Sequence, residues 1–321
     1  MTLNDIILCP ICNSDTERIN KLDSFYIKNK LLIHFNTELI DKTELINNLE
    51  IIDYNLMKCN ACSFEFSYPK TEGSNSFYNW VTSMPDYYTT SRWEYSKVLE
   101  LLSKDKSLKL LDVGCGDGRF FDKIVLSNNN IDFYGLDTTQ SSVDTCNKKG
   151  YKVFCMDIEK FKTEYKGYHF DAITLYHVLE HISNPKEFLC ELVSLINPSG
   201  AIYISTPYSP MDFEVQWFDV LNHPPHHMGR WNLESYTKLA EVTNLKIDIF
   251  MPESIKLIKS TIQSFQFSLF GTQKMITKLN ILKKIILHPL KFSLHLYKQF
   301  KRDKVNGKRA ANVILVRFSK K

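Results

Sequence analysis

The sequence predicts an α/β fold: a mainly parallel β-sheet covered by helices on both faces, with a small metal-binding segment in front of it. Three observations support this prediction. Short apolar runs alternate with amphipathic helical stretches from about residue 109 onward, the first of these runs leads into a glycine-rich turn, and two Cys-x-x-Cys pairs lie near the N-terminus. Strands that alternate with helices of roughly 10–15 residues are typical of βαβ units, whose parallel strands are buried on both sides.

Each expected strand is a short apolar run bounded by turn residues or by a helical stretch. The expected strands are Lys109–Val113, Asp132–Leu136, Tyr151–Met156, Phe170–Leu175, Ala201–Ser205, Leu245–Phe250 and Ala311–Phe318. The expected helices include Arg92–Leu102, Arg119–Leu126, Asn184–Ile196 and Asn232–Thr243. We therefore predict a core unit made of residues 76–254 and 311–321, with residues 255–310 inserted between its last two strands.

The composition excludes several classes of protein. With 321 residues, 44% of them hydrophobic, the chain can bury a sizeable core, so wholesale disorder, a collagen-like repeat and a disulfide-rich miniprotein are excluded. The N-terminal residues lack the basic and long apolar regions of a signal peptide, and no apolar stretch reaches the roughly 18 residues that span a bilayer. We expect a soluble, cytoplasmic protein.

The charge is distributed unevenly along the chain. Residues 1–254 hold 24 Lys and Arg against 35 Asp and Glu, whereas residues 255–310 hold 13 Lys and Arg against the single acid Asp303. Apolar residues at helical spacing over Met275–Leu287, and a second helical stretch after Pro289, make 255–310 a basic helical insert. It could cover a substrate crevice, bring the protein to the inner face of an anionic membrane, or contact nucleic acid. Nucleic acid is the least favoured partner, because the acidic remainder of the chain would repel it.

Four of the eight cysteines form two pairs, Cys9 with Cys12 and Cys59 with Cys62. In a reducing cytosol such pairs indicate a structural zinc ion held by four thiolates, rather than a disulfide. A redox dithiol and a metal-free segment are the alternatives. The 46 residues between the pairs exceed the usual spacing, so Asn13–Lys58 must form an inserted hairpin or small sheet. Residues 1–75 are thus predicted to be a zinc-ribbon-like domain.

The most specific motif is the turn Asp112–Gly118, in which glycines follow a strand and precede a helix. It lacks the third glycine of a dinucleotide fingerprint at the required spacing, and it is not a phosphate-binding loop. Asp137 ends the second strand, where a carboxylate can accept both hydroxyls of a ribose, and Asp157 ends the third. These features lie at the carboxyl ends of parallel strands and predict one nucleoside-binding crevice.

In the order and spacing of these motifs the chain resembles class I S-adenosylmethionine-dependent methyltransferases. The matching elements are the Asp112–Gly118 turn, Asp137, Asp157, and Phe170–Ile173 leading to His177–Ile182. The resemblance implies a Rossmann-like sheet of seven strands whose last strand is antiparallel. It also implies a cofactor site at Asp112, Gly114, Cys115, Gly116, Asp137, Asp157, Ile158 and Tyr176, covered by an aromatic N-terminal segment that contains Tyr88.

The cysteine pairs narrow the resemblance. A zinc ribbon in front of this core is similar to methyltransferases that modify sugars in surface-polysaccharide or antibiotic pathways. In the sugar C-methyltransferases among them, a Glu-His pair at the position of Glu180-His181 takes part in proton abstraction. Those relatives carry an extra C-terminal domain for which this chain lacks room, so oxygen is favoured over carbon as the methyl acceptor.

Two clusters of histidines bear on the chemistry. His177, Glu180 and His181 follow the fourth strand and are the candidate catalytic residues, with His181 favoured as the base and His177 as a packing or orienting residue. The segment Asn222–Trp231 follows the fifth strand, and its candidate substrate-binding residues are His226, His227, Arg230 and Trp231. His226 and His227 could instead bind a metal ion, with Asp212, Glu214 and Asp219 nearby.

The sequence as a whole predicts methyl transfer from S-adenosylmethionine to a hydroxyl of a sugar, nucleotide sugar or lipid-linked glycan. A ribosomal or transfer RNA methyltransferase with a zinc ribbon is the second hypothesis. A non-catalytic zinc-ribbon scaffold that binds a nucleoside is the third, and it is disfavoured because the glycine turn is intact.

Overall fold

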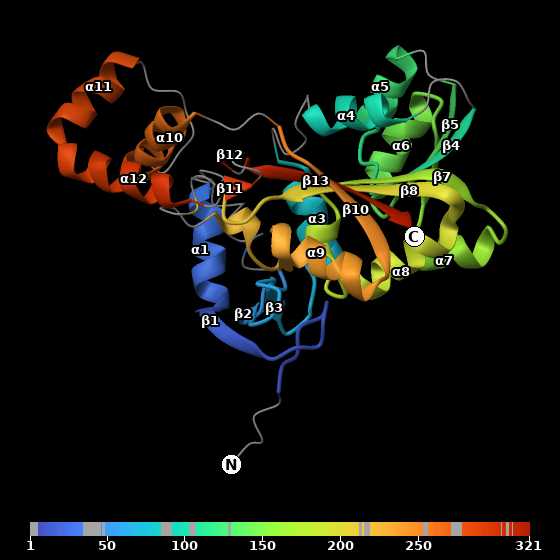
Figure 1. Cartoon of the computed structure of the whole chain (residues 1–321), viewed down its shortest axis with the longest axis horizontal. Coiled ribbons are helices and arrows are strands. Elements are labelled where there is room, and N and C mark those ends of the chain that lie inside the picture. Colours follow the sequence, from blue (N-terminus) through green and yellow to red (C-terminus); the bar gives the residue numbers. More distant parts are fainter. Residues whose placement is uncertain are drawn as a thin grey trace.

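The computed structural model describes residues 6–34, 46, 49–84, 92–102, 107–127, 130–211, 214, 219–252, 256–270, 278–302, 304–305, 308–309 and 311–321. A seven-stranded sheet in the order β10-β13-β8-β7-β4-β5-β6 forms its centre (Figure 1). Its strands are β4 (Leu108–Val113), β5 (Ile131–Asp137), β6 (Lys152–Cys155), β7 (Phe170–Tyr176), β8 (Ile196–Pro207), β10 (Leu245–Phe250) and β13 (Val313–Lys320). The strands from β4 to β8 pair in parallel, and β13 runs antiparallel to both β8 and β10. The predicted fold class is confirmed.

Helices cover both faces of this sheet (Figure 1). One face carries α4 (Trp93–Leu101), α5 (Arg119–Leu126) and α6 (Gln140–Lys148); the other carries α7 (Ile158–Glu164), α8 (Pro185–Leu195) and α9 (Leu233–Val242). Successive side chains of a strand point to opposite faces, so Leu110 packs in the first layer and Leu111 in the second. Because both faces are covered, the central strands β7 and β8 are buried over most of their length, which makes them recognisable in the sequence. Edge strands such as β10, with the sequence LKIDIF, keep charged residues among the apolar ones.

The N-terminal residues form a smaller sheet in the order β1-β2-β3-β9. Its elements are β1 (Thr16–Leu22), β2 (Tyr54–Cys59), β3 (Glu65–Tyr68) and β9 (Gly229–Arg230), with α1 (Ser24–His34) between β1 and β2, and α3 (Asn75–Thr82) after β3. The predicted insertion is a small sheet but not a simple hairpin, because α1 lies between its strands. Ile27 and Leu31 of α1 are buried in the same apolar cluster as Tyr54, which explains why a helix is stable there.

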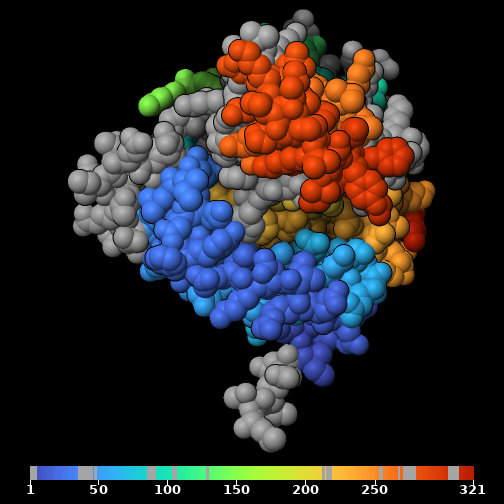
Figure 2. Space-filling view, turned by 90° about the vertical axis from the view of Figure 1, so that its left-hand side faces the viewer, coloured from blue at the N-terminus to red at the C-terminus, as the bar shows by residue number. Residues whose placement is uncertain are grey.

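The basic insert consists of helices α10 (Leu257–Phe270), α11 (Lys278–Leu287) and α12 (Pro289–Lys301), and the short strands β11 (Lys304–Val305) and β12 (Lys308–Arg309). Pro289 stands at the start of α12, where its missing N–H is tolerated, so it separates two helices as expected. The expected start of the helix, Met275, lies outside the described residues. Figure 2 shows α11 and α12 at the surface, beside the N-terminal unit. Within the described ranges no helix is long and apolar enough to cross a membrane.

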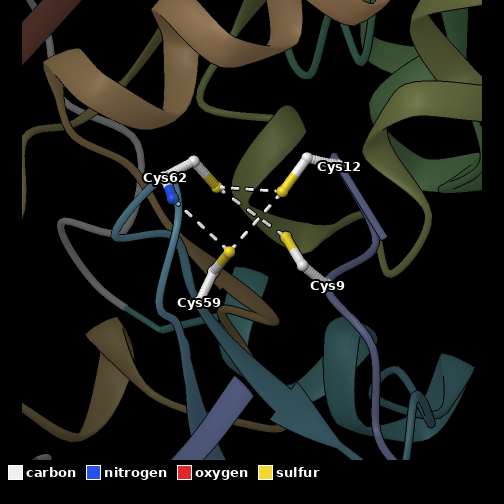
Figure 3. A group of neighbouring side chains, drawn as sticks. All are labelled: Cys9, Cys12, Cys59 and Cys62. Carbon is white, nitrogen blue, oxygen red and sulfur yellow. Dashed lines mark hydrogen bonds between the residues drawn. The ribbon is translucent and has the colours of Figure 1, made fainter. Parts of the chain in front are cut away.

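The four paired cysteines converge at the start of the N-terminal sheet (Figure 3). The Sγ atoms of Cys9 and Cys12 lie 3.8 Å from that of Cys62, and those of Cys12 and Cys59 are 3.5 Å apart. Four thiolates at about 2.3 Å from a tetrahedral zinc ion would stand about 3.8 Å from one another. Backbone N–H groups of Ile11, Ala61 and Cys62 point at these sulfurs, as they do around bound metals. The donor set and its spacing fit zinc.

The residues after the second cysteine pair also hold a segment that lies more than 160 residues later in the sequence. Strand β3 follows Cys62 and pairs with β9, with Glu65 opposite Arg230 and Phe66 opposite Gly229. The ring of Phe64 lies 4.6 Å from that of Trp231, and the Asn232 amide donates to the Ser63 carbonyl at 3.0 Å. The N-terminal unit therefore shares a core with the large sheet rather than standing apart from it.

Replacing Cys59 with Ser tests the metal site. We expect the purified variant to lose its one equivalent of zinc and to melt about 5 °C or more below the wild type, since metal-binding energy here is folding energy. Zinc is measured by mass spectrometry and Tm by calorimetry. Cys190→Ser, a change at an exposed cysteine outside the cluster, is the control. A wild-type protein that carries no zinc and whose Tm is unaffected by C59S would contradict the assignment.

Candidate functional site

A cavity of about 900 Å³ opens at the carboxyl ends of β4, β5, β6 and β7. This is the edge of a parallel sheet where ligands bind, and the volume is that of a small-molecule site. Of the residues predicted to bind the cofactor, it is lined by Asp112, Gly114, Cys115, Gly116, Asp137, Asp157, Ile158 and Tyr176. Of the candidate catalytic and substrate residues, it is lined by His177, Glu180, His181, His226 and His227. Tyr88 lies outside the described residues.

The glycine turn is shaped for close approach. Gly114 and Gly116 have φ angles of 73° and 56°, values that favour glycine. A Cβ on Gly114 would stand 2.5 Å from Val178 Cγ2, so a larger residue would push against the loop that follows β7. The turn therefore brings bare backbone to the cavity wall.

Asp137 is held at the end of β5 by the backbone. Its Oδ2 accepts the Gly116 N–H and its Oδ1 accepts the Thr139 N–H, both at 2.8 Å. Each oxygen keeps a second lone pair, so the carboxylate can still accept two ribose hydroxyls. Burial raises the pKa of Asp137 despite these hydrogen bonds. Asp157 caps α7 through the Lys160 N–H, with Ile158 beside it at the cavity wall.

The remaining cofactor candidates are buried under the turn. The Cys115 side chain packs against Gly135, where a Cβ would meet its sulfur at 2.8 Å. The Tyr176 ring lies edge-on to Tyr95 at 4.6 Å, and its hydroxyl has no hydrogen-bond partner within the described part of the chain. Because this hydroxyl is shut off from solvent, Tyr176 contributes other atoms than its hydroxyl to the cavity wall.

His177 stands at the sharp bend after β7, with a φ of 58° that is uncommon for a residue other than glycine. Its Nε2 lies 3.1 Å from Glu94 Oε1 and its Nδ1 lies 3.3 Å from Glu180 Oε1. Burial and Arg92 lower the pKa of His177, but the two carboxylates outweigh them and the pKa is raised. The two ion pairs hold the His177 ring and the bent backbone in one orientation. Glu94, on α4, was not singled out by the sequence, because an acid in a helix ordinarily faces water.

His181 has a defined tautomer. Its Nδ1 lies 2.5 Å from the His226 carbonyl oxygen, which can only accept, so Nδ1 carries a proton. In the neutral ring Nε2 then has a lone pair. The Tyr78 hydroxyl on α3 donates to the same carbonyl at 3.3 Å. His181 is thus oriented as a general base requires.

His226 and His227 are buried and neutral. Their Nδ1 atoms donate to the Leu221 carbonyl and to Asn222 Oδ1, each at 2.8 Å. Burial lowers the pKa of His226 to about 3 and holds that of His227 well below its ordinary value. With His181 they place three imidazoles whose ligand atoms lie within 4.8 Å of one another, a grouping that could also hold a metal ion.

Of the three carboxylates considered as metal partners of the histidines, two accept hydrogen bonds from other groups and the third lies outside the described residues. Glu214 accepts hydrogen bonds from Asn222 at 2.6 Å and from Arg230 at 2.9 Å. Asp219 accepts the Leu221 N–H and caps a short 3-10 helix, η2 (Val220–Asn222). Asp212 lies outside the described residues. Another 3-10 turn, η1 (Leu179–His181), carries Glu180, which is 1% exposed.

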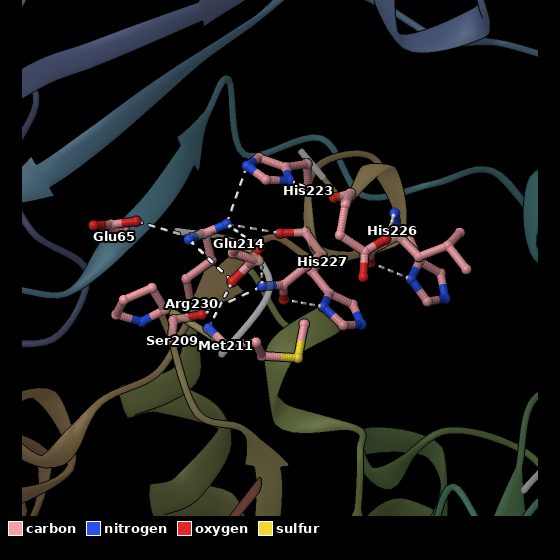
Figure 4. Close-up of polar contacts among 12 residues, drawn as sticks. Glu65, Ser209, Met211, Glu214, His223, His226, His227 and Arg230 are labelled. Atoms are coloured by element: carbon pink, nitrogen blue, oxygen red, sulfur yellow. Dashed lines mark hydrogen bonds and ion pairs between the residues drawn. The ribbon is translucent and has the colours of Figure 1, made fainter. Parts of the chain in front are cut away.

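The predicted substrate contacts of Arg230 and Trp231 are wrong. The Arg230 guanidinium is buried between Glu65 and Glu214, 2.9 Å from each, and donates to His223 Nε2 at 3.0 Å (Figure 4). Trp231 is 0% exposed and packs between Phe64 and Tyr236. Neither residue lines the cavity. Both side chains instead fix the strand β9 that follows the two histidines.

The burial of Asp112 can be tested through the pH dependence of the protein's stability. Burial raises its pKa to about 8, even though the Thr174 hydroxyl donates to it at 2.7 Å. The unfolded chain ionises near pH 3.8 while the folded chain stays protonated, so Asp112 costs stability as pH rises toward 8. Asp112→Asn should therefore gain stability relative to wild type between pH 5 and 8, by up to about 1.4 kcal/mol per pH unit. Urea unfolding of both proteins at four pH values measures this; a constant difference would contradict it.

Comparison with known proteins agrees with this geometry. A family model described as a methyltransferase domain matches residues 88–248. The ubiquinone biosynthesis O-methyltransferase of Rickettsia conorii is 27% identical over 199 residues, which cover 59% of this chain and 60% of that protein. Its mitochondrial namesake from Dictyostelium discoideum is 28% identical over 175 residues, 46% of this chain and 54% of that protein. The matched regions thus span three fifths or less of these relatives.

Among solved structures, a SAM dependent methyltransferase from Archaeoglobus fulgidus has a TM-score of 0.48 and 18% identity, covering 76% of this chain and all of the other. The family model spans half of the chain and includes the glycine turn, Asp137 and the bend at His177. The same residues build the cavity described above. The chain belongs to the methyltransferase family.

Proposed function

We propose that the protein transfers a methyl group from S-adenosylmethionine to a hydroxyl oxygen of a small acceptor. One observation carries the proposal: a single cavity joins the Asp137 crevice to the imidazole of His181. S-adenosylmethionine, when bound, supplies an electrophilic methyl group. The glycine turn, Asp137 and Asp157 would hold it, and the histidines would face the acceptor.

A side chain of this protein can accept the proton that the acceptor hydroxyl loses. A hydroxyl that attacks a methyl group must lose its proton, and His181 Nε2 has the lone pair to take it. The imidazolium that forms keeps its Nδ1–H on the His226 carbonyl, which stabilises the new charge. His226 and His227 are poorer bases because burial keeps them neutral. We assign them the positioning of the acceptor, together with Tyr78.

The acceptor class is part of the proposal. A sugar or glycan hydroxyl is our first candidate. Several imidazoles and the phenol of Tyr78 line the cavity and suit such an acceptor. A phenolic hydroxyl is the second, favoured by the names of the relatives, which are O-methyltransferases of ubiquinone biosynthesis. A zinc-ribbon RNA methyltransferase has less support, since the described residues that line the cavity include none from the basic insert. Parallel assays with nucleotide sugars and with catechols, at equal concentration, separate the first two.

Asp137→Ala tests the cofactor site. Removal of the two charge-assisted hydrogen bonds to the ribose should weaken S-adenosylhomocysteine binding about 100-fold or more. Titration calorimetry measures the affinity, and circular dichroism and Tm establish that the variant folds. Asp132→Ala, at a half-exposed acid on the same strand, is the matched control. Equal affinity of wild type and D137A would remove Asp137 from the site.

His181→Gln tests the base. We expect kcat to fall about 10²- to 10⁴-fold with cofactor affinity unchanged, because only proton removal is lost. Transfer of a labelled methyl group to the acceptor found in the screen gives the rate. His288→Gln, at an exposed histidine between α11 and α12, should leave it unaltered. If H181Q keeps full activity while His227→Gln abolishes it, His227 is the base.

A further inference from the structure

The outward face of α12 is apolar, which is the reverse of an ordinary surface helix. Its inward face packs on α10, with Phe292 at 5.4 Å from Phe265 and His295 Nδ1 at 3.0 Å from the Ser264 hydroxyl. Leu290, Leu294 and Tyr297 follow one another at spacings of four and three and so share the opposite face. They are 87%, 50% and 54% exposed, and Phe300 beside them is 63% exposed.

Helix α11 continues this surface. Leu282 and Ile286, four residues apart, are 54% and 69% exposed. Leu287, 66% exposed, and Leu290 flank the bend at Pro289, so the most exposed apolar side chains of these two helices gather where the helices meet. Figure 2 shows these helices as one outward-facing layer. A monomeric protein seldom leaves this much apolar surface in water unless something binds it.

The charged side chains of α11, α12 and the residue that follows α12 are all basic. Residues 278–302 contain six Lys and one Arg and no Asp or Glu. Lys283 and Lys301 are exposed, and the Lys301 ammonium lies 4.9 Å from the Tyr297 ring. Their long stems can lie along the apolar side chains while their charges reach an anionic layer.

The surface is also firmly attached to the domain. Arg302 follows α12, is buried, and donates to the carbonyls of Pro210 and Ala311 at 3.0 and 3.2 Å. Ala311 leads into β13, so the end of α12 is fixed to the central sheet. Binding at α11 and α12 would therefore hold the whole protein.

We propose that α11 and α12 dock on the surface of an anionic lipid bilayer. The apolar side chains at the junction of the two helices would enter the interface: Ile286, Leu287, Leu290 and Leu294. Exposed apolar side chains flanked by lysines are the composition of helices that lie in a membrane interface. A second copy of the chain would bring an equally basic surface against this one and be repelled. Nucleic acid would use the lysines but would leave the leucines in water.

Vesicle flotation tests the docking and needs neither cofactor nor acceptor, so its outcome is independent of the proposed reaction. The full-length protein should float with vesicles of phosphatidylcholine and phosphatidylglycerol at a ratio of about 3:1, and not with pure phosphatidylcholine. Leu290→Ser/Leu294→Ser should weaken the partition at least about tenfold, since two apolar side chains no longer enter the interface. These positions are exposed, so the fold should survive, as Tm will show.

Val125→Ser/Leu126→Ser is the matched control, because these residues are 55% and 76% exposed at the end of α5. Lys283→Gln/Lys301→Gln provides a second variant and should also weaken binding to the anionic vesicles. The proposal is overturned if the wild type stays with the unbound fraction. It is equally overturned if the leucine variant floats like the wild type, or if light scattering shows a dimer that only this variant dissociates.

Discussion

The pairing of β3 with β9 is the contact on which the arrangement of the site depends. Strand β3 leaves the second cysteine pair, and β9 ends the segment that carries His226 and His227. The two strands approach so closely that a Cβ on Gly229 would stand 2.7 Å from the Phe64 ring. The Arg230 guanidinium closes the junction between Glu65 and Glu214. The second cysteine pair near the N-terminus thus helps to position imidazoles that lie more than 160 residues later in the sequence.

The same segment is tied to the bend after β7. The Met228 N–H donates to the Glu180 carbonyl at 2.7 Å, and the His181 ring donates to the His226 carbonyl. Burial then gives the histidines different charge behaviour: His226 and His227 stay neutral, whereas two carboxylates raise the pKa of His177. Hydrogen bonds to backbone carbonyls and the ion pairs of His177 with Glu94 and Glu180 preorganise the site, and such preorganisation favours catalysis.

Much of the fold and part of the site could be predicted from local patterns. Apolar runs that end near Asp112, Asp137 and Asp157 mark strands, and the topology of a parallel sheet brings their ends together. The roles of Arg230 and Trp231 could not be predicted this way, because their partners Glu65 and Phe64 are more than 160 residues away in sequence. An Arg and a Trp in a polar, proline-containing segment resemble ligand contacts until a distant strand covers them.

The sequence by itself determined the strand and helix order, the glycine turn, the acids at the strand ends and the pairing of four cysteines, because each follows from residue type and short-range spacing. Only the tertiary structure decided which polar side chains face the cavity and which neutralise one another inside the protein. In the folded protein His181 donates to the His226 carbonyl, Glu94 pairs with His177, and the leucines of α12 face outward. Those outcomes depend on which surfaces meet across the fold, and pairwise burial between remote segments leaves no periodic signature in the chain.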